Sequence, residues 1–221
     1  MIVPLLFWDI QQRIRGIRVI YLLRHGETEW NRLRRLQGQL DSPLTPRGLE
    51  QASAMGRTVR ELLGPGAPGF RMVCSPLGRA RRTAERVAEV LGYDPAAIAE
   101  EPRLMEIAFG IWQGEIEAEL PRKFPELWRA READKWNVPV PGGESYALVA
   151  ARLAEWLAEQ PADARLIVVG HGLAGRILRG LYGRAGPEEV FAMEEPQDAL
   201  YRLAAGVITR FDTALEAGAR L

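Results

Sequence analysis

The stretch Val19-Ile-Tyr-Leu-Leu-Arg24-His25-Gly26-Glu27-Thr28 decides the fold that we expect for this chain of 221 residues. Its first five residues form a short apolar run rich in β-formers, which is typical of a strand buried in a parallel sheet. His25 comes at the end of that run, and Gly26 after it allows the backbone to turn and to approach a ligand closely. A histidine at a strand end is therefore the first candidate for a functional residue.

The same arrangement occurs a second time, near the carboxyl terminus of the chain. Arg165-Leu-Ile-Val-Val169 is the most strand-like run in the sequence, and Gly170-His171-Gly172 follows it directly. The chain contains two histidines, and both lie in this setting. Ligands of open α/β sheets bind beyond the carboxyl ends of the strands, so we expect His25 and His171 to serve one site.

Strands and helices alternate along the rest of the chain. The other expected strands are those over 71–75, 200–203 and 207–211, the last two as a hairpin around Gly206. The expected helices are those over 46–63, 79–91, 145–159 and 172–183. Thr45-Pro46 is typical of a helix start and Gly92 of a helix end. This alternation predicts an α/β fold, a three-layer α/β/α sandwich with a mostly parallel central sheet.

Composition excludes several classes of function. The 29 basic and 29 acidic residues give a formal net charge of zero, which argues against a nucleic acid or an anionic membrane as partner. Cys74 is the single cysteine, so the chain has no internal disulfide and no cysteine-built metal site. Two histidines are too few for a histidine-rich metal site, and we expect no metal. Only Lys123 and Lys135 could serve as a phosphate-binding or Schiff-base lysine.

We expect two parts in the chain. Residues 1–16 form an N-terminal extension whose apolar start is too short to span a membrane and lacks the features of a signal peptide. Residues 17–221 form a single domain, with a lid-like insertion at about 108–142. No other apolar run approaches membrane length, so the expected location is the cytoplasm. The oligomeric state is not specified by these patterns.

Four sequence blocks resemble those of the histidine phosphatase superfamily, also called the phosphoglycerate mutase-like family. The blocks are Arg24-His25-Gly26-Glu27-Thr28, Ser75-Pro-Leu-Gly-Arg79, Leu104-Met-Glu106 with Phe109-Gly110, and Gly170-His171-Gly172. They occur in the family's order, and the match covers roughly residues 17 to 211. One Arg-His-Gly motif alone would be weak evidence for the family, but the four blocks together are highly specific for it.

These residue types suit phosphoryl transfer. A neutral imidazole is a nucleophile at neutral pH, which assigns His25 to attack on phosphorus. Arg24 and Arg79 offer forked, permanently charged donors for phosphate oxygens, and His171 can donate a further hydrogen bond. Glu106 is the expected proton donor to the leaving oxygen and the base for the attacking water.

Two further phosphate-binding groups are expected. The family pattern implies a neutral donor from the Asn31 side chain. The start of a helix at Gly172 would add backbone N–H groups, which bind anions well. The resemblance implies a metal-independent phosphatase that needs no cofactor and acts on a small-molecule phosphomonoester through a phosphohistidine intermediate.

Two alternatives remain beside the phosphatase interpretation. The family also contains phosphoglycerate mutases that use a bisphosphate cofactor, and the fold could serve as a phosphate-binding or signalling protein without turnover. Mutases carry Arg-His-Tyr-Gly after the catalytic glutamate, where this chain has Ile107-Ala-Phe109-Gly110. Only 64 residues separate Glu106 from His171, fewer than the enclosing insertion of a mutase requires. The apolar residues of 107–112 and 124–136 suggest an uncharged or aromatic leaving group.

Several other features are expected to be structural. Gly170-His-Gly-Leu-Ala-Gly175 fits GxGxxG, and Glu195 lies about 20 residues further on, but the 46 residues that remain are too few for a dinucleotide domain. Cys74 is expected to be a buried thiol. Arg81 and Arg82 are expected on the surface, and tryptophans 112, 128 and 136 in the packing of the lid.

Overall fold

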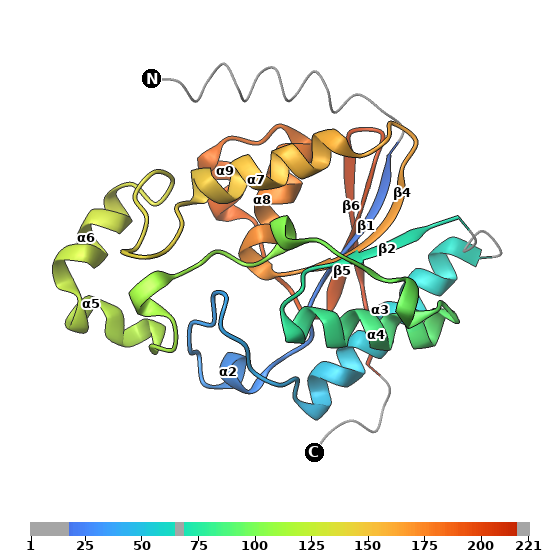
Figure 1. The fold of residues 1–221 in the computed structure, drawn as a ribbon, viewed down its shortest axis with the longest axis horizontal. Helices are drawn as coiled ribbons and strands as arrows, with labels where there is room; N and C mark the ends of the chain where they lie inside the picture. The colour runs from blue at the N-terminus through green and yellow to red at the C-terminus, as the bar shows by residue number, and fades with distance from the viewer. Residues whose placement is uncertain (1–17, 65–68, 216–221) are drawn as a thin grey trace.

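A six-stranded sheet forms the centre of the protein. The computed structural model describes residues 18–64 and 69–215, so the expected extension over 1–16 lies outside the described residues. The strand order is β3-β2-β4-β1-β5-β6 (Figure 1). The strands are β1 (Val19–Arg24), β2 (Arg71–Cys74), β3 (Ala99–Glu100), β4 (Arg165–Gly170), β5 (Ala199–Ala204) and β6 (Val207–Asp212). The first four in this order are parallel, and β5 and β6 are antiparallel at one edge, which confirms a mostly parallel sheet.

Helices cover both faces of the sheet. The helices α7 (Tyr146–Glu159), α8 (Gly172–Gly183) and α9 (Pro187–Ala192) lie on one face, and α3 (Pro46–Leu63) and α4 (Gly78–Leu91) on the other (Figure 1). Alternate residues of β1 point to opposite faces, as the pleat of a strand requires. Ile20 and Leu22 belong to the cluster under α7 and α8, and Tyr21 and Leu23 to the cluster under α3 and α4. The three-layer α/β/α sandwich is confirmed.

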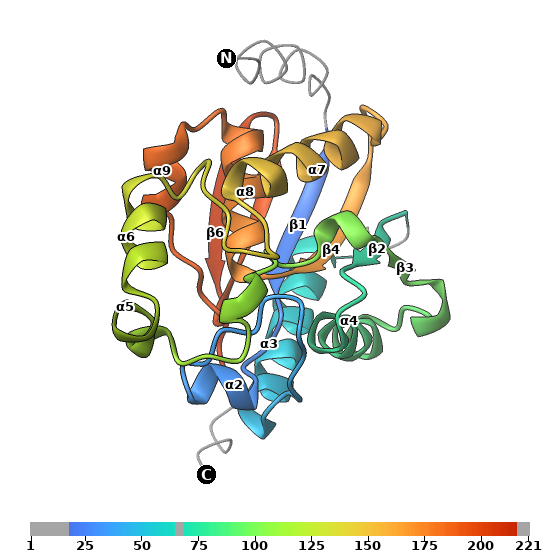
Figure 2. The same cartoon turned by 60° about the vertical axis from the view of Figure 1, so that its left-hand side comes forward.

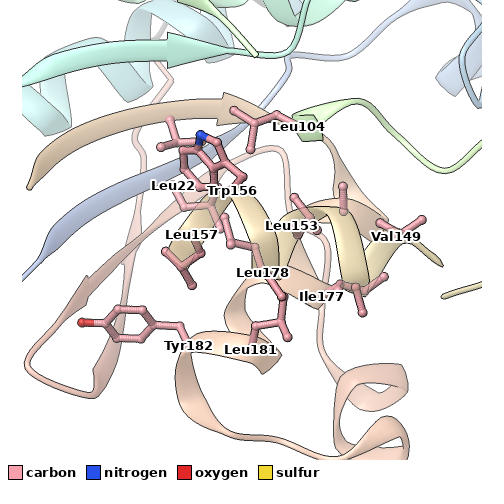
Figure 3. Packing of buried hydrophobic residues seen from close by; sticks show 14 of the residues in the cluster. Leu22, Leu104, Val149, Leu153, Trp156, Leu157, Ile177, Leu178, Leu181 and Tyr182 are labelled. Atoms are coloured by element: carbon pink, nitrogen blue, oxygen red, sulfur yellow. The ribbon is translucent and has the colours of Figure 1, made fainter. Parts of the chain in front are cut away.

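The larger hydrophobic cluster fixes α7 and α8 against the sheet. Figure 3 shows Leu153, Trp156 and Leu157 of α7 beside Ile177 and Leu178 of α8, packed over β1. These side chains are almost fully buried. Because burial of one large apolar side chain stabilises a fold by roughly 1.5–3 kcal/mol, this cluster holds the start of α8 firmly in place.

The predicted helix ends are confirmed by their capping geometry. Thr45 Oγ1 accepts a hydrogen bond of 3.0 Å from the Gly48 amide at the start of α3. Gly92 ends α4 with φ 67°, a left-handed conformation that glycine adopts without strain. Ser145 caps the start of α7.

The segment 108–142 (called the 108–142 segment below) projects to one side of the sandwich. It contains α5 (Leu120–Lys123) and α6 (Pro125–Ala133), which lie away from α3 and α4 in both views (Figure 2). Trp112, Leu120 and Val140 form a small hydrophobic cluster of its own, with Phe124 and Trp128 against it. The tryptophans at 112 and 128 therefore pack as expected, whereas Trp136 packs against the larger cluster.

The short elements were not predicted. They include α2 (Glu29–Arg32), β3, α5, α6, α9 and the single-turn 3₁₀ helices Pro95–Ala97, Pro102–Leu104, Gly110–Trp112 and Glu117–Glu119. Elements of two to nine residues give too few repeats for a periodic apolar pattern. Among residues 18–64 and 69–215, no helix is both long and apolar enough to cross a membrane.

Candidate active site

The register of β1 and β4 brings the two histidines together. Arg24 at the end of β1 lies opposite Gly170 at the end of β4. The residue that follows each strand is a histidine, so both histidines lie at the same edge of the sheet. The His25 amide donates a hydrogen bond of 2.9 Å to the Gly170 carbonyl. The two imidazole rings lie 5.2 Å apart between centroids, and both are buried. The two histidines are therefore neighbours at this edge of the sheet, and their service in one site stays a prediction.

His25 is held as a neutral imidazole whose Nε2 carries no proton. Its Nδ1 lies 2.8 Å from the Gly26 carbonyl oxygen, which can only accept, so the proton resides on Nδ1 and the lone pair on Nε2. Burial lowers the pKa of His25 well below its ordinary value, and the charges of Arg79 and Arg24 lower it further. His25 Nε2 is therefore nucleophilic at neutral pH.

Gly26 makes this geometry sterically possible. A Cβ atom at position 26 would lie 2.1 Å from the backbone oxygen of Gly48. The loop after β1 and the start of α3 therefore pack backbone against backbone. Any side chain at position 26 would push the carbonyl that orients His25 out of place.

His171 retains one ring nitrogen for a ligand. Its Nε2 lies 2.8 Å from the Ser75 hydroxyl oxygen, at the end of β2. Its Nδ1 is buried and has no hydrogen-bond partner among residues 18–64 and 69–215. Burial lowers the pKa of His171 well below its ordinary value, and the charge of Arg79 lowers it further. A buried nitrogen without a partner is costly, and a bound phosphate oxygen would give it one.

Arg79 is anchored beside His25 by the loop after α2. Its Nε donates a hydrogen bond of 3.3 Å to His25 Nε2. Its Nη1 donates to the Leu40 carbonyl at 2.7 Å and to Asp41 Oδ1 at 3.0 Å, and its Nη2 donates to the Gly38 carbonyl at 2.7 Å. The guanidinium is thus fixed in place before any ligand arrives.

Arg24 is placed by the loop before β5. Its Nη1 donates to the backbone carbonyl of Glu195, and its Nε is buried without a hydrogen-bond partner in the described part of the chain. Arg24 and Arg79 thus present two permanent charges near His25, as the sequence blocks predicted.

Asn31 is oriented by donors that occupy its amide oxygen. Oδ1 accepts from the Thr28 amide at 3.0 Å and from Gln197 Nε2 at 3.1 Å. The Asn31 side chain therefore has only its NH₂ group left to offer a ligand. Gln197 also donates to the His25 carbonyl at 3.3 Å. Sequence reasoning missed Gln197, because it lies in no recognisable motif.

Glu106 lies across the amino terminus of α8. Its Oε1 accepts from the Ala174 amide at 2.9 Å, and its Oε2 accepts from the Leu173 amide at 3.1 Å. A helix amino terminus favours a carboxylate at this place. Gly172 is the first residue of α8, so its own amide has no intrahelical acceptor. A Cβ at Gly172 would lie 2.3 Å from Glu195 Oε2, so a side chain there would displace the Glu195 carboxylate.

A cleft of about 360 Å³ opens at this edge of the sheet. Five of the predicted site residues line it, namely Arg24, His25, Asn31, Arg79 and Glu106. His171 and Gly172 line a small adjoining cavity that shares Arg24 and Glu195 with the cleft. The 108–142 segment contributes Phe109, Trp112, Glu117, Leu120, Trp128, Arg131, Glu132 and Lys135 to the lining.

Glu195 is a further group at the site that sequence reasoning did not assign. Its carboxylate lies 2.9 Å from Arg176, and it lines both cavities. Burial raises the pKa of Glu195, and the nearby Glu106 raises it further. The only sequence signal for Glu195 was its distance from the GxGxxG match, which pointed to a different ligand.

Cys74 and the two arginines that follow Arg79 on α4 lie outside the cleft lining. Cys74 is fully buried, and burial raises the pKa of its thiol to about 11, so it is no nucleophile at neutral pH. Arg81 and Arg82 pair with Glu85 on α4 and do not line the cleft. Among the described residues, no group of three histidine, cysteine, aspartate or glutamate side chains could hold a metal ion.

The fold and these residues define a class of protein. The chain matches the model of the histidine phosphatase superfamily (branch 1) over residues 20–206, and it belongs to that family. It is 38% identical over 164 residues to the "Probable phosphoglycerate mutase GpmB" of Erwinia tasmaniensis, covering 72% of each chain. A protein of the same name from Salmonella paratyphi C is 38% identical over 159 residues, covering 70% of each chain.

Two solved structures with this fold carry phosphatase names. The alpha-ribazole phosphatase of Shigella flexneri matches with a TM-score of 0.74 at 23% identity, over 88% of this chain and 95% of that chain. At that identity the likeness shows the fold alone. A mycobacterial glucosyl-3-phosphoglycerate phosphatase, solved in complex with VO3, matches with a TM-score of 0.69 at 26% identity, over 91% of this chain and all of that one.

Proposed function

We propose that this protein is a phosphomonoester hydrolase that works through a phosphohistidine at His25. The observation that carries the proposal is the unprotonated Nε2 of His25, which accepts a hydrogen bond from Arg79 in a cleft that Glu106 also lines. Nucleophile, positive charge and proton-transfer group are the three elements that phosphoryl transfer requires.

In the first step, His25 Nε2 attacks phosphorus, a new N–P bond forms and the P–O bond to the leaving group breaks. Arg24, Arg79, the Asn31 NH₂ group, His171 Nδ1 and the Gly172 amide bind the non-bridging oxygens. Glu106 donates a proton to the leaving oxygen.

In the second step, water attacks the phosphohistidine. Glu106 accepts the proton of the water, the N–P bond breaks and the electron pair returns to His25 Nε2. The lowered pKa of His25 suits it for this departure as a neutral imidazole at neutral pH. Inorganic phosphate then leaves, and the free enzyme is restored.

Two observations favour a hydrolase over a phosphoglycerate mutase, although the curated relatives cited above carry mutase names. Ile107, which stands where the mutases have an arginine, is fully buried and cannot contact a substrate. Phe109 offers only an apolar ring. A mutase must also exclude water from its phosphohistidine, whereas a hydrolase must admit it.

A panel of phosphomonoesters tests the proposal. It includes p-nitrophenyl phosphate and 3-phosphoglycerate, the latter with and without 2,3-bisphosphoglycerate. We expect release of inorganic phosphate without isomerisation of 3-phosphoglycerate. Isomerisation that depends on the bisphosphate would identify a mutase. No turnover of any ester would favour the third interpretation, a phosphate-binding member of the family.

A further inference from the structure

Ser75 lies next to His171 and has no part in the steps proposed above. It follows β2 directly, and its amide donates a hydrogen bond of 3.0 Å to the Val169 carbonyl of β4. Because β2 and β4 are parallel neighbours, the residues just beyond their ends lie side by side. Ser75 is fully buried, and its Oγ lies 2.8 Å from His171 Nε2. The hydroxyl is therefore placed to act on the ring of His171.

The Ser75 hydroxyl has one proton to donate and two lone pairs with which to accept. The Leu77 amide, which can only donate, lies 3.3 Å from Oγ and occupies a lone pair. The second partner of Oγ in the described part of the chain is His171 Nε2. A buried hydroxyl proton without an acceptor costs free energy, so this proton points to Nε2. Ser75 thus donates, and His171 Nε2 accepts.

This direction of the hydrogen bond determines which ring nitrogen of His171 carries the proton. In a neutral imidazole one nitrogen is protonated and the other holds a lone pair. Since Nε2 accepts from Ser75, the proton lies on Nδ1. Nδ1 is the buried nitrogen that has no hydrogen-bond partner within residues 18–64 and 69–215. The lowered pKa of His171 keeps the ring neutral, so that its two nitrogens differ in character at neutral pH.

The two tautomers of His171 differ in what they offer to a phosphate. The oxygens of a phosphate dianion that bear its charge can only accept, so they need an N–H group at Nδ1. The other tautomer would place a lone pair on Nδ1, which repels those oxygens, and would leave the Ser75 proton without an acceptor. Both effects favour the Nδ1-protonated form when phosphate binds.

We infer that Ser75 is a positioning residue, whose hydroxyl holds His171 in the Nδ1-protonated form that donates to a phosphoryl oxygen. The link to phosphate rests on the proposed function, which places the phosphate at His25, 5.2 Å from His171 between ring centroids. His25 is in the same tautomer for a different reason, the Gly26 carbonyl at its Nδ1. One ring thus offers an unprotonated nitrogen to phosphorus, and the other offers an N–H group to oxygen.

Nitrogen NMR of the imidazole rings tests the tautomer directly, because protonated and unprotonated ring nitrogens resonate far apart. The full chain contains two histidines, and the spectrum of His25→Asn assigns their signals. Near neutral pH we expect His171 of the wild type to be protonated at Nδ1 alone. In Ser75→Ala neither ring nitrogen has a partner, so we expect a mixture of both tautomers. Ser75→Thr keeps a hydroxyl and should keep the wild-type form.

Binding of inorganic phosphate, measured by calorimetry, connects the tautomer with the site. We expect Ser75→Ala to bind phosphate roughly tenfold more weakly than the wild type, the effect of weakening one hydrogen bond to a charged ligand. Ser75→Thr should recover most of the affinity. Ser53→Ala is the matched control, because Ser53 is also a buried serine, bonds to the Leu49 carbonyl within α3 and does not line the cleft. It should change neither the tautomer nor the affinity.

The outcomes separate the inference from the proposed function. An Nε2-protonated His171 in the wild type overturns the inference, and this result needs no variant. A Ser75→Ala protein that keeps the wild-type tautomer and phosphate affinity overturns it as well. If Ser75→Thr behaves like Ser75→Ala in both measurements, the effect comes from packing, and the role of the hydroxyl is refuted. Hydrolysis of p-nitrophenyl phosphate is measured in parallel. The expected tautomers and affinities without hydrolysis would contradict the hydrolase and leave the role of Ser75 supported.

Discussion

Arg79 Nε donates a hydrogen bond of 3.3 Å to Nε2 of His25, although the two residues are 54 positions apart in the sequence. The bond connects the end of β1 with the start of α4. It holds the nitrogen that we propose as nucleophile and a fixed positive charge in one geometry. Phosphate that reaches this nitrogen therefore meets a guanidinium already in position, which lowers the cost of reorganisation during the reaction.

Replacement of Arg79 should lower the catalytic rate. We expect Arg79→Gln to lower kcat by about 10²–10³, the usual effect of removing one preorganised donor to a developing charge. Arg82→Gln on the same helix is the control, because the Arg82 side chain is 55% exposed and pairs with Glu85. Steady-state kinetics and circular dichroism of both variants would check this. A loss below tenfold in a folded Arg79→Gln protein would contradict the role of Arg79.

Glu106→Gln should affect substrates according to their leaving groups. We expect kcat for an alkyl phosphate to fall by about 10²–10⁴, because the leaving alkoxide needs a proton. Nitrophenolate needs none, so p-nitrophenyl phosphate should still show a burst of product before slow attack by water limits turnover. Stopped-flow absorbance measures the burst. Glu117→Gln, also in the cleft lining, should behave like the wild type, and equal losses for both ester types would contradict the assignment.

Acidification should destabilise the protein through its two histidines. As pH falls below about 6.5, the unfolded chain takes up a proton at each histidine, but the folded chain does not, because both pKa values are lowered. Each histidine should therefore remove about 1.4 kcal/mol of unfolding free energy per pH unit, until its folded-state pKa is reached. Urea unfolding between pH 7 and pH 5 should show a smaller decline in His171→Asn. An identical decline in both proteins would contradict this explanation.

Asn31→Asp tests the orientation of the Asn31 amide. Its oxygen already accepts from Thr28 and Gln197, so the substitution replaces the NH₂ group that faces the ligand by a second acceptor with negative charge. We expect kcat/KM to fall by roughly tenfold to a hundredfold, mostly through KM. Asn137→Asp, at an exposed position that contacts Asp134, should leave kcat/KM unchanged. An unchanged KM in Asn31→Asp would show that Asn31 does not contact the phosphate.

The long elements and the histidine pair could be predicted from the sequence because local patterns determine them. Apolar runs marked β1 and β4, and capping residues such as Thr45 and Gly92 marked helix ends. His25 and His171 could be placed at one edge because parallel strands align their carboxyl ends. The roles proposed for Arg24, Arg79 and Glu106 rest on the resemblance together with their residue types.

Other parts of the site could not be predicted, because they depend on contacts between distant segments. Gln197 reaches Asn31 from 166 positions away, and no motif marks it. Arg131 is one of many arginines in the sequence, and only the packing of Phe109, Trp112 and Tyr146 around it distinguishes it. The support of Glu106 by the amides of α8 likewise depends on how the loop after β3 meets that helix.

The most direct test of the central claim is to trap the phosphoenzyme. The protein is mixed with a labelled phosphomonoester, quenched in alkali and mapped by mass spectrometry. We predict an acid-labile label on His25, present in His171→Asn and absent from His25→Asn. A label that survives in His25→Asn, or one that resists acid, would contradict a phosphohistidine at His25.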